Sequence, residues 1–115
     1  MIRFSLLGSG SSGNAILATS NTTKILIDNG LSFKQLRLRS DEVGLSIDDL
    51  DAVFITHEHG DHVLGLGTLA RRIGAPVFMT RGTYESLPPS LGALPNVVLF
   101  EAGDTIPIGN VQIES

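Results

Sequence analysis

The sequence of 115 residues contains no cysteine and no tryptophan, and only 5% of its residues are aromatic. The lack of cysteine excludes disulfide bonds and metal sites built on thiolates. Basic residues are also few, with 8 Lys and Arg against 12 Asp and Glu, so the net charge of −4 offers no electrostatic surface for nucleic acid. Chemistry on phosphates would need positive charge from another source, such as bound metal.

Long hydrophobic runs are missing as well. Hydrophobic residues make up 42% of the chain, but runs such as AVFI (52–55) and ILI (25–27) are far too short to cross a bilayer. The N-terminal stretch MIRFSLLGSGSSG is too weakly apolar for a signal peptide. We therefore expect a globular domain in the cytoplasm, with no membrane partner.

The pattern of apolar residues predicts an α/β protein. A helix is expected from an N-cap at Ser32 to near Gly44, a second one over Val63–Ile73 with Gly74 at its C-terminus, and a short one from Thr80 to Ser86. Between and around them, strands are expected at 2–8, 14–20, 24–30, 51–56, 76–80, 96–100, 104–108 and 110–114. The basic cluster of the first helix is expected to be a solvated helix face; it consists of Lys34, Arg37 and Arg39.

The stretch GSGSSG (8–13) fits the G-x-G-x-x-G spacing of a dinucleotide-binding loop, and Asp28 follows Gly8 at a suitable distance. That fingerprint requires a helix after the third glycine, whereas NAILATSNTT is short and rich in turn-forming residues. A tight glycine turn between antiparallel strands is the preferred interpretation. A loop whose backbone approaches a ligand is a further alternative, and no dinucleotide is expected to bind.

The stretch THEHGDH (56–62) contains all three histidines of the chain and two carboxylates. His57 and His59 are two residues apart at the end of a strand and can point the same way, while Asp61 and His62 lie on the following turn. Imidazole and carboxylate ligands suit zinc, iron or manganese, and a site without thiols is more typical of catalysis than of structural metal. A single histidine would be read as a surface or core residue, but this grouping predicts a metal site.

THEHGDH after a buried strand resembles the T-H-x-H-x-D-H signature of the metallo-β-lactamase-fold hydrolases. KILIDNG and GDTIPIGNVQIE also resemble segments of that superfamily, and GSGSSGNA with ILIDNGLS and THEHGDHVLGLG is similar to its YycJ/WalJ-like exonuclease branch. The resemblance implies an αββα sandwich, with a mixed sheet and flanking helices. It also implies that residues 1–115 form the N-terminal half of that domain, with the C-terminal half absent from this chain, which ends at a strand edge that is normally covered.

Carried over to this sequence, the resemblance implies that His57 and His59 bind one divalent metal ion, and that Asp61 and His62 bind a second. Asp61 is thus also the candidate catalytic residue, and Asp28 is expected to support the motif loop from behind. The glycine-rich loop is expected to border the substrate opening through Ser9, Ser11, Ser12 and Asn14. Further ligands of the family, which include more histidines, are expected after Ser115, because no histidine follows His62.

The function implied is that of a hydrolase using metal-activated hydroxide, with two Zn or Mn ions in the complete enzyme. The expected activity is that of an exonuclease on single-stranded DNA or RNA. Two alternatives stay open: hydrolysis of a small ester, thioester, lactone or lactam, and a non-catalytic half-domain. The 115 residues alone are expected to be inactive and to pair with another chain, as in a homo-oligomer, or to aggregate.

Overall fold

The computed structural model of the protein describes residues 2–11 and 13–115. Its main sheet has six strands that lie side by side in the order of the sequence. The pairs β1–β2 and β2–β3 are antiparallel, and the pairs from β3 to β6 are parallel. The strands of this sheet are β1 (Arg3–Gly8), β2 (Ala15–Thr19), β3 (Lys24–Ile27), β4 (Ala52–Phe54), β5 (Val77–Thr80) and β6 (Val97–Phe100).

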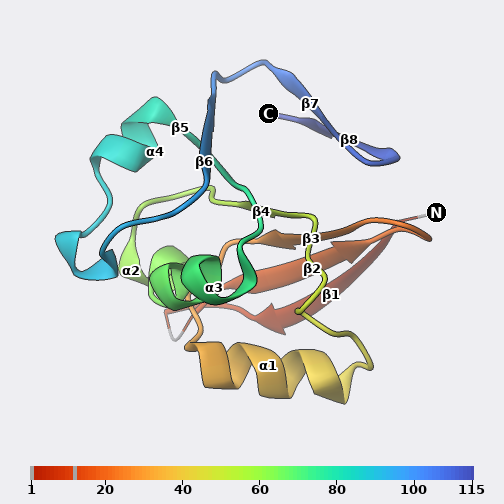
Figure 1. Cartoon of the computed structure of the whole chain (residues 1–115). Coiled ribbons are helices and arrows are strands. Elements are labelled where there is room, and N and C mark those ends of the chain that lie inside the picture. Colours follow the sequence, from red (N-terminus) through yellow and green to blue (C-terminus); the bar gives the residue numbers. More distant parts are fainter. Residues whose placement is uncertain (1, 12) are drawn as a thin grey trace.

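Outside this sheet, a hairpin and several helices complete the fold. The hairpin strands are β7 (Thr105–Ile108) and β8 (Val111–Glu114), and the helices are α1 (Phe33–Glu42), α2 (Gly60–Val63), α3 (Leu66–Ile73), α4 (Arg81–Glu85) and the 3₁₀ helix η1 (Pro89–Leu91). Figure 1 shows α1 and α3 on one side of the main sheet and the hairpin on the other. The predicted α/β fold, with a mixed sheet and flanking helices, is confirmed. Among residues 2–11 and 13–115, no helix has the length and apolarity to cross a membrane.

The N-terminus of α1 is determined by local sequence. The Ser32 side chain accepts a hydrogen bond from the N–H of Gln35 at 3.2 Å, which satisfies one of the free donors of the first turn. Leu36 is fully buried and attaches the helix to the sheet. The helix ends at Glu42, close to the predicted end near Gly44, whose φ of 75° stops further helix.

The predicted helix over 63–73 is wrong in one respect, because the structure contains two helices there. α2 ends at Val63 and α3 begins at Leu66. Between them, the N–H of Gly65 donates to the carbonyl oxygen of Asn29 at 3.0 Å instead of continuing one helical ladder. The apolar spacing continues across this break because both helices face the same core. The predicted C-terminus at Gly74 is confirmed, with φ of 76° and its N–H bonded to Ala70.

The turn between β1 and β2 contains GSGSSG. The two strands are antiparallel, and Leu6 and Gly8 pair with Ile16 and Ala15. The predicted glycine turn is therefore confirmed, and β2 occupies the place where a dinucleotide fingerprint requires a helix. The predicted loop residue Ser12 lies outside the described residues.

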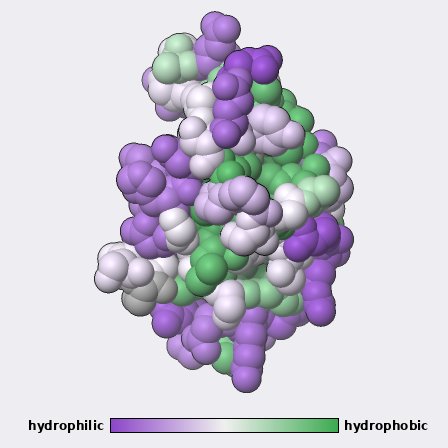
Figure 2. All heavy atoms as spheres, turned by 90° about the vertical axis from the view of Figure 1, so that its left-hand side faces the viewer, coloured by the Kyte–Doolittle hydropathy of each residue, from purple (hydrophilic) through white to green (hydrophobic). Residues whose placement is uncertain are grey.

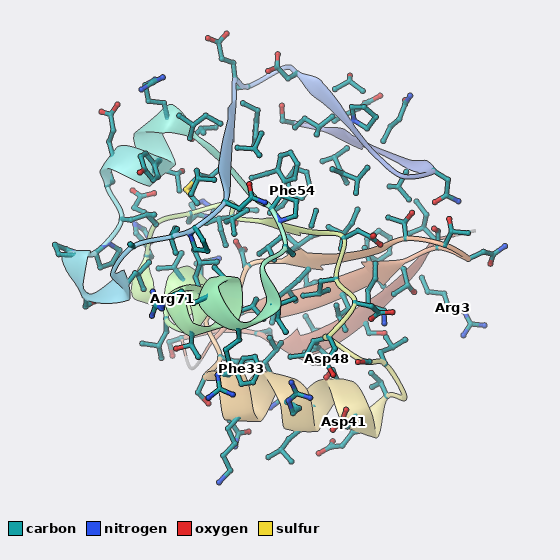
Figure 3. All side chains as sticks on the ribbon, viewed as in Figure 1. Arg3, Phe33, Asp41, Asp48, Phe54 and Arg71 are labelled. Carbon is teal, nitrogen blue, oxygen red and sulfur yellow. The ribbon has the colours of Figure 1, made fainter. Side chains whose placement is uncertain are left out.

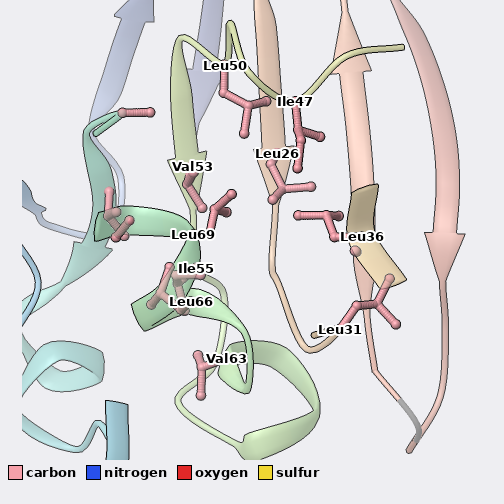
Figure 4. Close-up of a cluster of buried hydrophobic side chains, with 14 of the residues drawn as sticks. Leu26, Leu31, Leu36, Ile47, Leu50, Val53, Ile55, Val63, Leu66 and Leu69 are labelled. Carbon is pink, nitrogen blue, oxygen red and sulfur yellow. The ribbon is translucent and has the colours of Figure 1, made fainter. Parts of the chain in front are cut away.

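The main hydrophobic core lies between the sheet and the helices α1 and α3. Leu26 of β3 and Val53 of β4 point to this side and are almost completely buried. Leu36 of α1 and Leu69 of α3 pack against them (Figure 4). Burying an aliphatic side chain stabilises the fold by about 1.5–3 kcal/mol. This core therefore provides a rigid base for the loops at the ends of the strands.

The opposite face of the sheet is also apolar, but the β7–β8 hairpin covers only part of it. Phe54 and Phe78 stack on this face with ring centroids 4.7 Å apart, and Val111 of the hairpin belongs to the same hydrophobic cluster. Phe54 lies between the sheet and the hairpin in Figure 3. Farther along the face, Phe4 and Leu6 of β1 are 68% and 65% exposed. Among residues 2–11 and 13–115, no element completes a second layer over this face.

A cavity of about 390 Å³ lies beneath the hairpin and is lined mainly by apolar side chains, including Phe54, Phe100 and Ile113. The hairpin is anchored at its turn, where the hydroxyls of Ser20 and Thr23 each donate to Asn110 Oδ1 at 2.7 Å. The largest hydrophobic area of the surface in Figure 2 lies in its upper half. The exposure of Phe4 and Leu6 shows that the apolar character of the sheet face extends to the molecular surface.

The basic cluster of α1 is only partly a solvated face. Lys34 is exposed as expected, and Arg37 forms an exposed ion pair with Asp48 at 2.8 Å. The hydrogen bond from Arg37 lowers the pKa of Asp48. Arg39 is half-buried and donates to the carbonyl oxygen of Leu7 at 2.8 Å, so it joins the helix to β1.

Candidate metal centre

The stretch THEHGDH lies where the parallel strand β4 ends. The N–H of Ile55 still donates to the carbonyl oxygen of Phe78 at 3.0 Å, which continues the pairing of β4 with β5. Residues 56–59 then form a loop outside helices and strands, and α2 follows directly. Ligand sites of α/β proteins lie beyond the carboxyl ends of parallel strands, so the loop is at the expected place for function.

The fold brings the predicted metal ligands together. The ring centroids of His57 and His62 are 4.9 Å apart, and those of His57 and His59 are 6.0 Å apart. Asp61 Oδ2 lies 3.8 Å from His62 Nε2. Within residues 2–11 and 13–115, however, no three histidine or acidic side chains form a group that could hold a metal ion. The four candidate ligands are therefore neighbours, and their assignment to two metal ions stays a prediction.

The carboxylate of Asp28 lies behind these side chains and is 6% exposed. Its Oδ1 accepts a hydrogen bond from the N–H of Thr56 at 2.7 Å. Its Oδ2 is 2.6 Å from the hydroxyl of Thr56 and 2.7 Å from Nδ1 of His62. Asp28 has a φ of 61°, a conformation that costs a non-glycine residue of order 1–3 kcal/mol and that is concentrated at functional sites. The strained residue thus connects β3 to both ends of the motif.

These hydrogen bonds determine which nitrogen of each imidazole is available. An ionised carboxylate only accepts, so His62 Nδ1 carries the proton that it shares with Asp28. The single proton of the Thr56 hydroxyl is also donated to Asp28. The hydroxyl must therefore accept the 3.0 Å bond from His57, whose Nδ1 is the donor. In the neutral form of both imidazoles, this leaves the lone pair on Nε2, which can bind a cation.

The backbone of residues 28–30 packs directly beneath α2. The N–H of Asn29 donates to the carbonyl oxygen of His62 at 2.8 Å. A Cβ atom at Gly30 would overlap the carbonyl oxygen of Asp61, so only glycine allows this close approach. The Asn29 side chain is fully buried, and neither of its polar atoms has a hydrogen-bond partner among the described residues. The motif is thus supported by the backbone as well as by Asp28.

The glycine-rich loop lies beside the motif. Ser9 and Ser11 are exposed there, as a role at a substrate opening would require, whereas Asn14 is half-buried. The Asn14 side chain donates to Asp61 at its carbonyl oxygen and at Oδ2, at 3.0 and 3.2 Å. Contact of Ser9, Ser11 and Asn14 with substrate stays a prediction. The hydrogen bonds from Asn14 to Asp61 are a further role of Asn14 that the sequence did not indicate.

The nitrogen and oxygen donors of the candidate ligands are of the chemical types that bind divalent metal ions. Two imidazoles present Nε2, a third lies beside them, and a carboxylate without a hydrogen-bonded Oδ1 among the described residues completes the set. Neutral imidazole and carboxylate are the ligands of catalytic zinc and manganese sites. The residues that sequence reasoning missed are Thr56 and Asn14 as supports. For Thr56 a signal was available, since it opens the T-H-x-H-x-D-H motif.

Solved structures share this architecture. Rm3 metallo-beta-lactamase is 25% identical, with a TM-score of 0.79 over 95% of this chain and 46% of that protein. MIM-2 Metallo-Beta-Lactamase is 27% identical, with a TM-score of 0.71 over 93% of this chain and 46% of that protein. In both, the similarity covers about half of the solved protein.

Proteins of similar sequence also match nearly the whole chain, over less than half of their own length. Exodeoxyribonuclease YycJ of Bacillus anthracis is 35% identical over 99% of this chain, and Exodeoxyribonuclease WalJ of Streptococcus pneumoniae serotype 2 is 38% identical over 98% of it. The chain spans 44% of the length of each of these relatives. Residues 8–114 match the Metallo-beta-lactamase superfamily, so nearly the whole chain is covered. The chain belongs to the metallo-β-lactamase superfamily.

Proposed function

We propose that this chain belongs to a divalent-metal-dependent phosphodiesterase that acts as an exonuclease on single-stranded DNA or RNA. The observation that carries the hydrolase assignment is the hydrogen-bond network of Asp28, which in the neutral imidazoles leaves Nε2 of His57 and of His62 unprotonated. Nε2 of His62 lies 3.8 Å from Oδ2 of Asp61. The nucleic-acid substrate is supported by the similarity to two exodeoxyribonucleases at 35% and 38% identity.

In this proposal, His57 and His59 hold one cation, and Asp61 and His62 hold the other. Bound divalent cations, Zn or Mn, would supply water of lowered pKa and positive charge toward the phosphodiester. Asp28 fixes the ring of His62 and, through Thr56, that of His57. A histidine with a fixed ring loses less conformational entropy when it becomes a ligand, so the protein prepares the site before binding.

The charge of the chain is consistent with a site in which bound cations supply the positive charge and the protein supplies their ligands. With a net charge of −4, these 115 residues by themselves repel a phosphodiester. The charges of bound cations would offset that repulsion at the reacting phosphate. The exposed hydroxyls of Ser9 and Ser11, together with Ser12, would then donate to nonbridging oxygens of the substrate, and they add no charge.

We further propose that residues 1–115 form the N-terminal half of the catalytic domain. Four ligands for two cations leave each ion with two protein donors, which is fewer than catalytic sites normally have. The partly uncovered apolar face, with Phe4 and Leu6 exposed, requires a second layer. This chain matches 44% of the length of each relative. A second half of the same domain can therefore supply both the further metal ligands and the cover for the apolar face.

A small-molecule hydrolase is the second candidate. It is favoured by the likeness to Rm3 metallo-beta-lactamase, whose TM-score of 0.79 extends over 95% of this chain. The two candidates differ in the charge of the reacting group. A phosphodiester is negatively charged, and that charge must be offset, whereas the reacting carbonyl of a lactam or thioester is neutral.

A comparison of substrates tests the proposal. The full-length protein that contains this chain is loaded with Mn²⁺ or Zn²⁺ and given a labelled single-stranded oligonucleotide, nitrocefin or a thioester. We expect release of nucleotides from one end of the oligonucleotide and no turnover of the other two. Turnover of nitrocefin or the thioester alone would instead identify a small-molecule hydrolase.

A further inference from the structure

The side chain of Asn14 has one orientation that satisfies all its neighbours. Its Oδ1 accepts from the N–H of Gly10 at 3.1 Å, and its Nδ2 donates to the carbonyl oxygen of Gly10, also at 3.1 Å. The remaining neighbours of Nδ2 are the carbonyl oxygen and Oδ2 of Asp61. Nδ2 has two hydrogens for these three acceptors, so two of the acceptors share one hydrogen. Because all neighbours of Nδ2 are acceptors and the neighbour of Oδ1 is a donor, a flipped amide would lose these bonds.

The backbone of Asn14 is attached to the same segment. Its N–H donates to the carbonyl oxygen of Asp61 at 2.7 Å, and its own carbonyl oxygen accepts from the N–H of Gly30 at 3.0 Å. Asn14 is thus fixed between the glycine-rich loop and α2, at a sequence separation of 47 residues from Asp61. A residue fixed in this way can hold the position of a neighbouring side chain.

We propose that Asn14 is a positioning residue, whose amide orients the carboxylate of Asp61 for metal binding. This inference rests on the proposed function, because it assumes that Asp61 is a ligand. The amide occupies Oδ2 and thereby limits rotation of the carboxylate, while Oδ1 stays free of hydrogen bonds among the described residues. The bond is 3.2 Å long, so it orients the carboxylate without competing strongly for its charge.

The chemical type of the side chain matters here. A lysine or arginine at this position would also donate to Asp61, but its positive charge would oppose binding of a cation nearby. A neutral amide keeps the full negative charge of Asp61 available. Asn14 is therefore expected to affect the cation held by Asp61 and His62 and to leave the one held by His57 and His59 almost unchanged.

A double-mutant cycle on metal binding tests this inference. Full-length protein freed of metal is titrated with Co²⁺, and binding is followed by calorimetry and by visible absorption. The proteins compared are the wild type, Asn14→Ala, Asp61→Ala and the double variant, with Asn21→Ala in the exposed β2–β3 turn as the matched control. The melting temperature of each metal-free protein is measured as well.

We expect Asn14→Ala to weaken one of two Co²⁺ sites by about 10- to 100-fold and to change its absorption spectrum, as the loss of an outer partner of a ligand does. In the Asp61→Ala background, Asn14→Ala should have no further effect, because the residue acts through Asp61. Equal weakening of both sites, or the same loss with and without Asp61, would show a general structural role and overturn the inference. The control Asn21→Ala should bind as the wild type does.

Two further outcomes are also decisive. Should Asn14→Ala lose its fold, Asn14→Ser replaces it with the same expectations, since the serine side chain lacks the amide N–H groups that contact Asp61. If the wild type binds no Co²⁺, the proposed function fails and the inference with it. If the wild type binds two ions and the Asn14 variants bind them equally well, only the inference is wrong.

Discussion

The Oδ2 atom of Asp28 lies 2.7 Å from Nδ1 of His62, and the same oxygen accepts a hydrogen bond from the Thr56 hydroxyl. A single buried carboxylate therefore orients two imidazoles, one directly and one through Thr56 and its 3.0 Å contact with His57. Asp28 reaches this position in a left-handed backbone conformation, with φ of 61°. In our account, the backbone strain at Asp28 is the cost of preparing the site for metal.

The first prediction concerns the ligands. In the full-length protein, His57→Ala and His62→Ala should each lower the rate of hydrolysis by more than about 100-fold, because loss of an outer partner alone can cost that much. The fold should survive, since both side chains lie outside the hydrophobic core. Cleavage of a labelled oligonucleotide and circular dichroism provide the measurements. The control is Glu58→Ala within the same motif, which should retain activity; a His62→Ala enzyme of normal rate would contradict the assignment.

The second prediction separates the hydroxyl of Thr56 from its shape. Thr56→Val keeps the shape but leaves Nδ1 of His57 without its acceptor, so both tautomers of His57 should become populated. Metal affinity should fall by about 10- to 100-fold. Thr56→Ser keeps the hydroxyl and should resemble the wild type. The tautomer is read from ¹⁵N chemical shifts of the imidazole in the metal-free protein, and identical spectra for the Val and Ser variants would disprove the role of Thr56.

The third prediction concerns the close approach at Gly30. Gly30→Ala forces a methyl group against the carbonyl oxygen of Asp61, so the free energy of unfolding should fall by about 1–3 kcal/mol or more. Gly82→Ala is the matched control, because a Cβ atom there meets none of the described residues within 4 Å. This change should be neutral or stabilise α4 by up to about 1 kcal/mol. Urea unfolding measures both, and equal stability of the two variants would show that the loop beneath α2 adapts easily.

The fourth prediction concerns the apolar face that the hairpin leaves uncovered. The 115 residues expressed alone should dimerise or aggregate, and Phe4→Lys should reduce this association because Phe4 is 68% exposed on that face. Val43→Lys is the control, since Val43 is 50% exposed at the end of α1. Size-exclusion chromatography with light scattering gives the mass. A monodisperse wild-type monomer would mean that this face needs no further cover.

Much of the fold follows from local sequence. The cap at Ser32, the left-handed turn at Gly74 and the antiparallel turn in GSGSSG were predictable because each depends on residues a few positions apart. The break between α2 and α3 was not, because it depends on a hydrogen bond from Gly65 to Asn29, far away in the sequence. Periodicity reports which side of a helix is buried, and this is the same before and after the break.

The candidate site also has features that local sequence predicts and features that depend on residues far apart in the chain. The grouping of His57, His59 and His62 in one motif already indicates metal, since the residue types alone determine the possible chemistry. The supports come from other parts of the chain, with Asp28 28 residues from Thr56 and Asn14 47 residues from Asp61. These contacts result from the parallel pairing of β3 with β4 and from the close approach of Asn14 and of residues 29–30 to α2. No local pattern contains them: only the family resemblance predicts Asp28 as a support, and the roles of Thr56 and Asn14 required the structure.

The measurement that tests the central claim most directly is removal and return of metal in the full-length protein. A chelator should abolish cleavage of the single-stranded oligonucleotide, and added Mn²⁺ or Zn²⁺ should restore it in the wild type. Asp61→Asn keeps the shape of the side chain but loses its charge, so the same metal should restore little or no activity. Cleavage that persists after complete removal of metal, or full activity of metal-replete Asp61→Asn, would contradict a metal-dependent hydrolase built on this site.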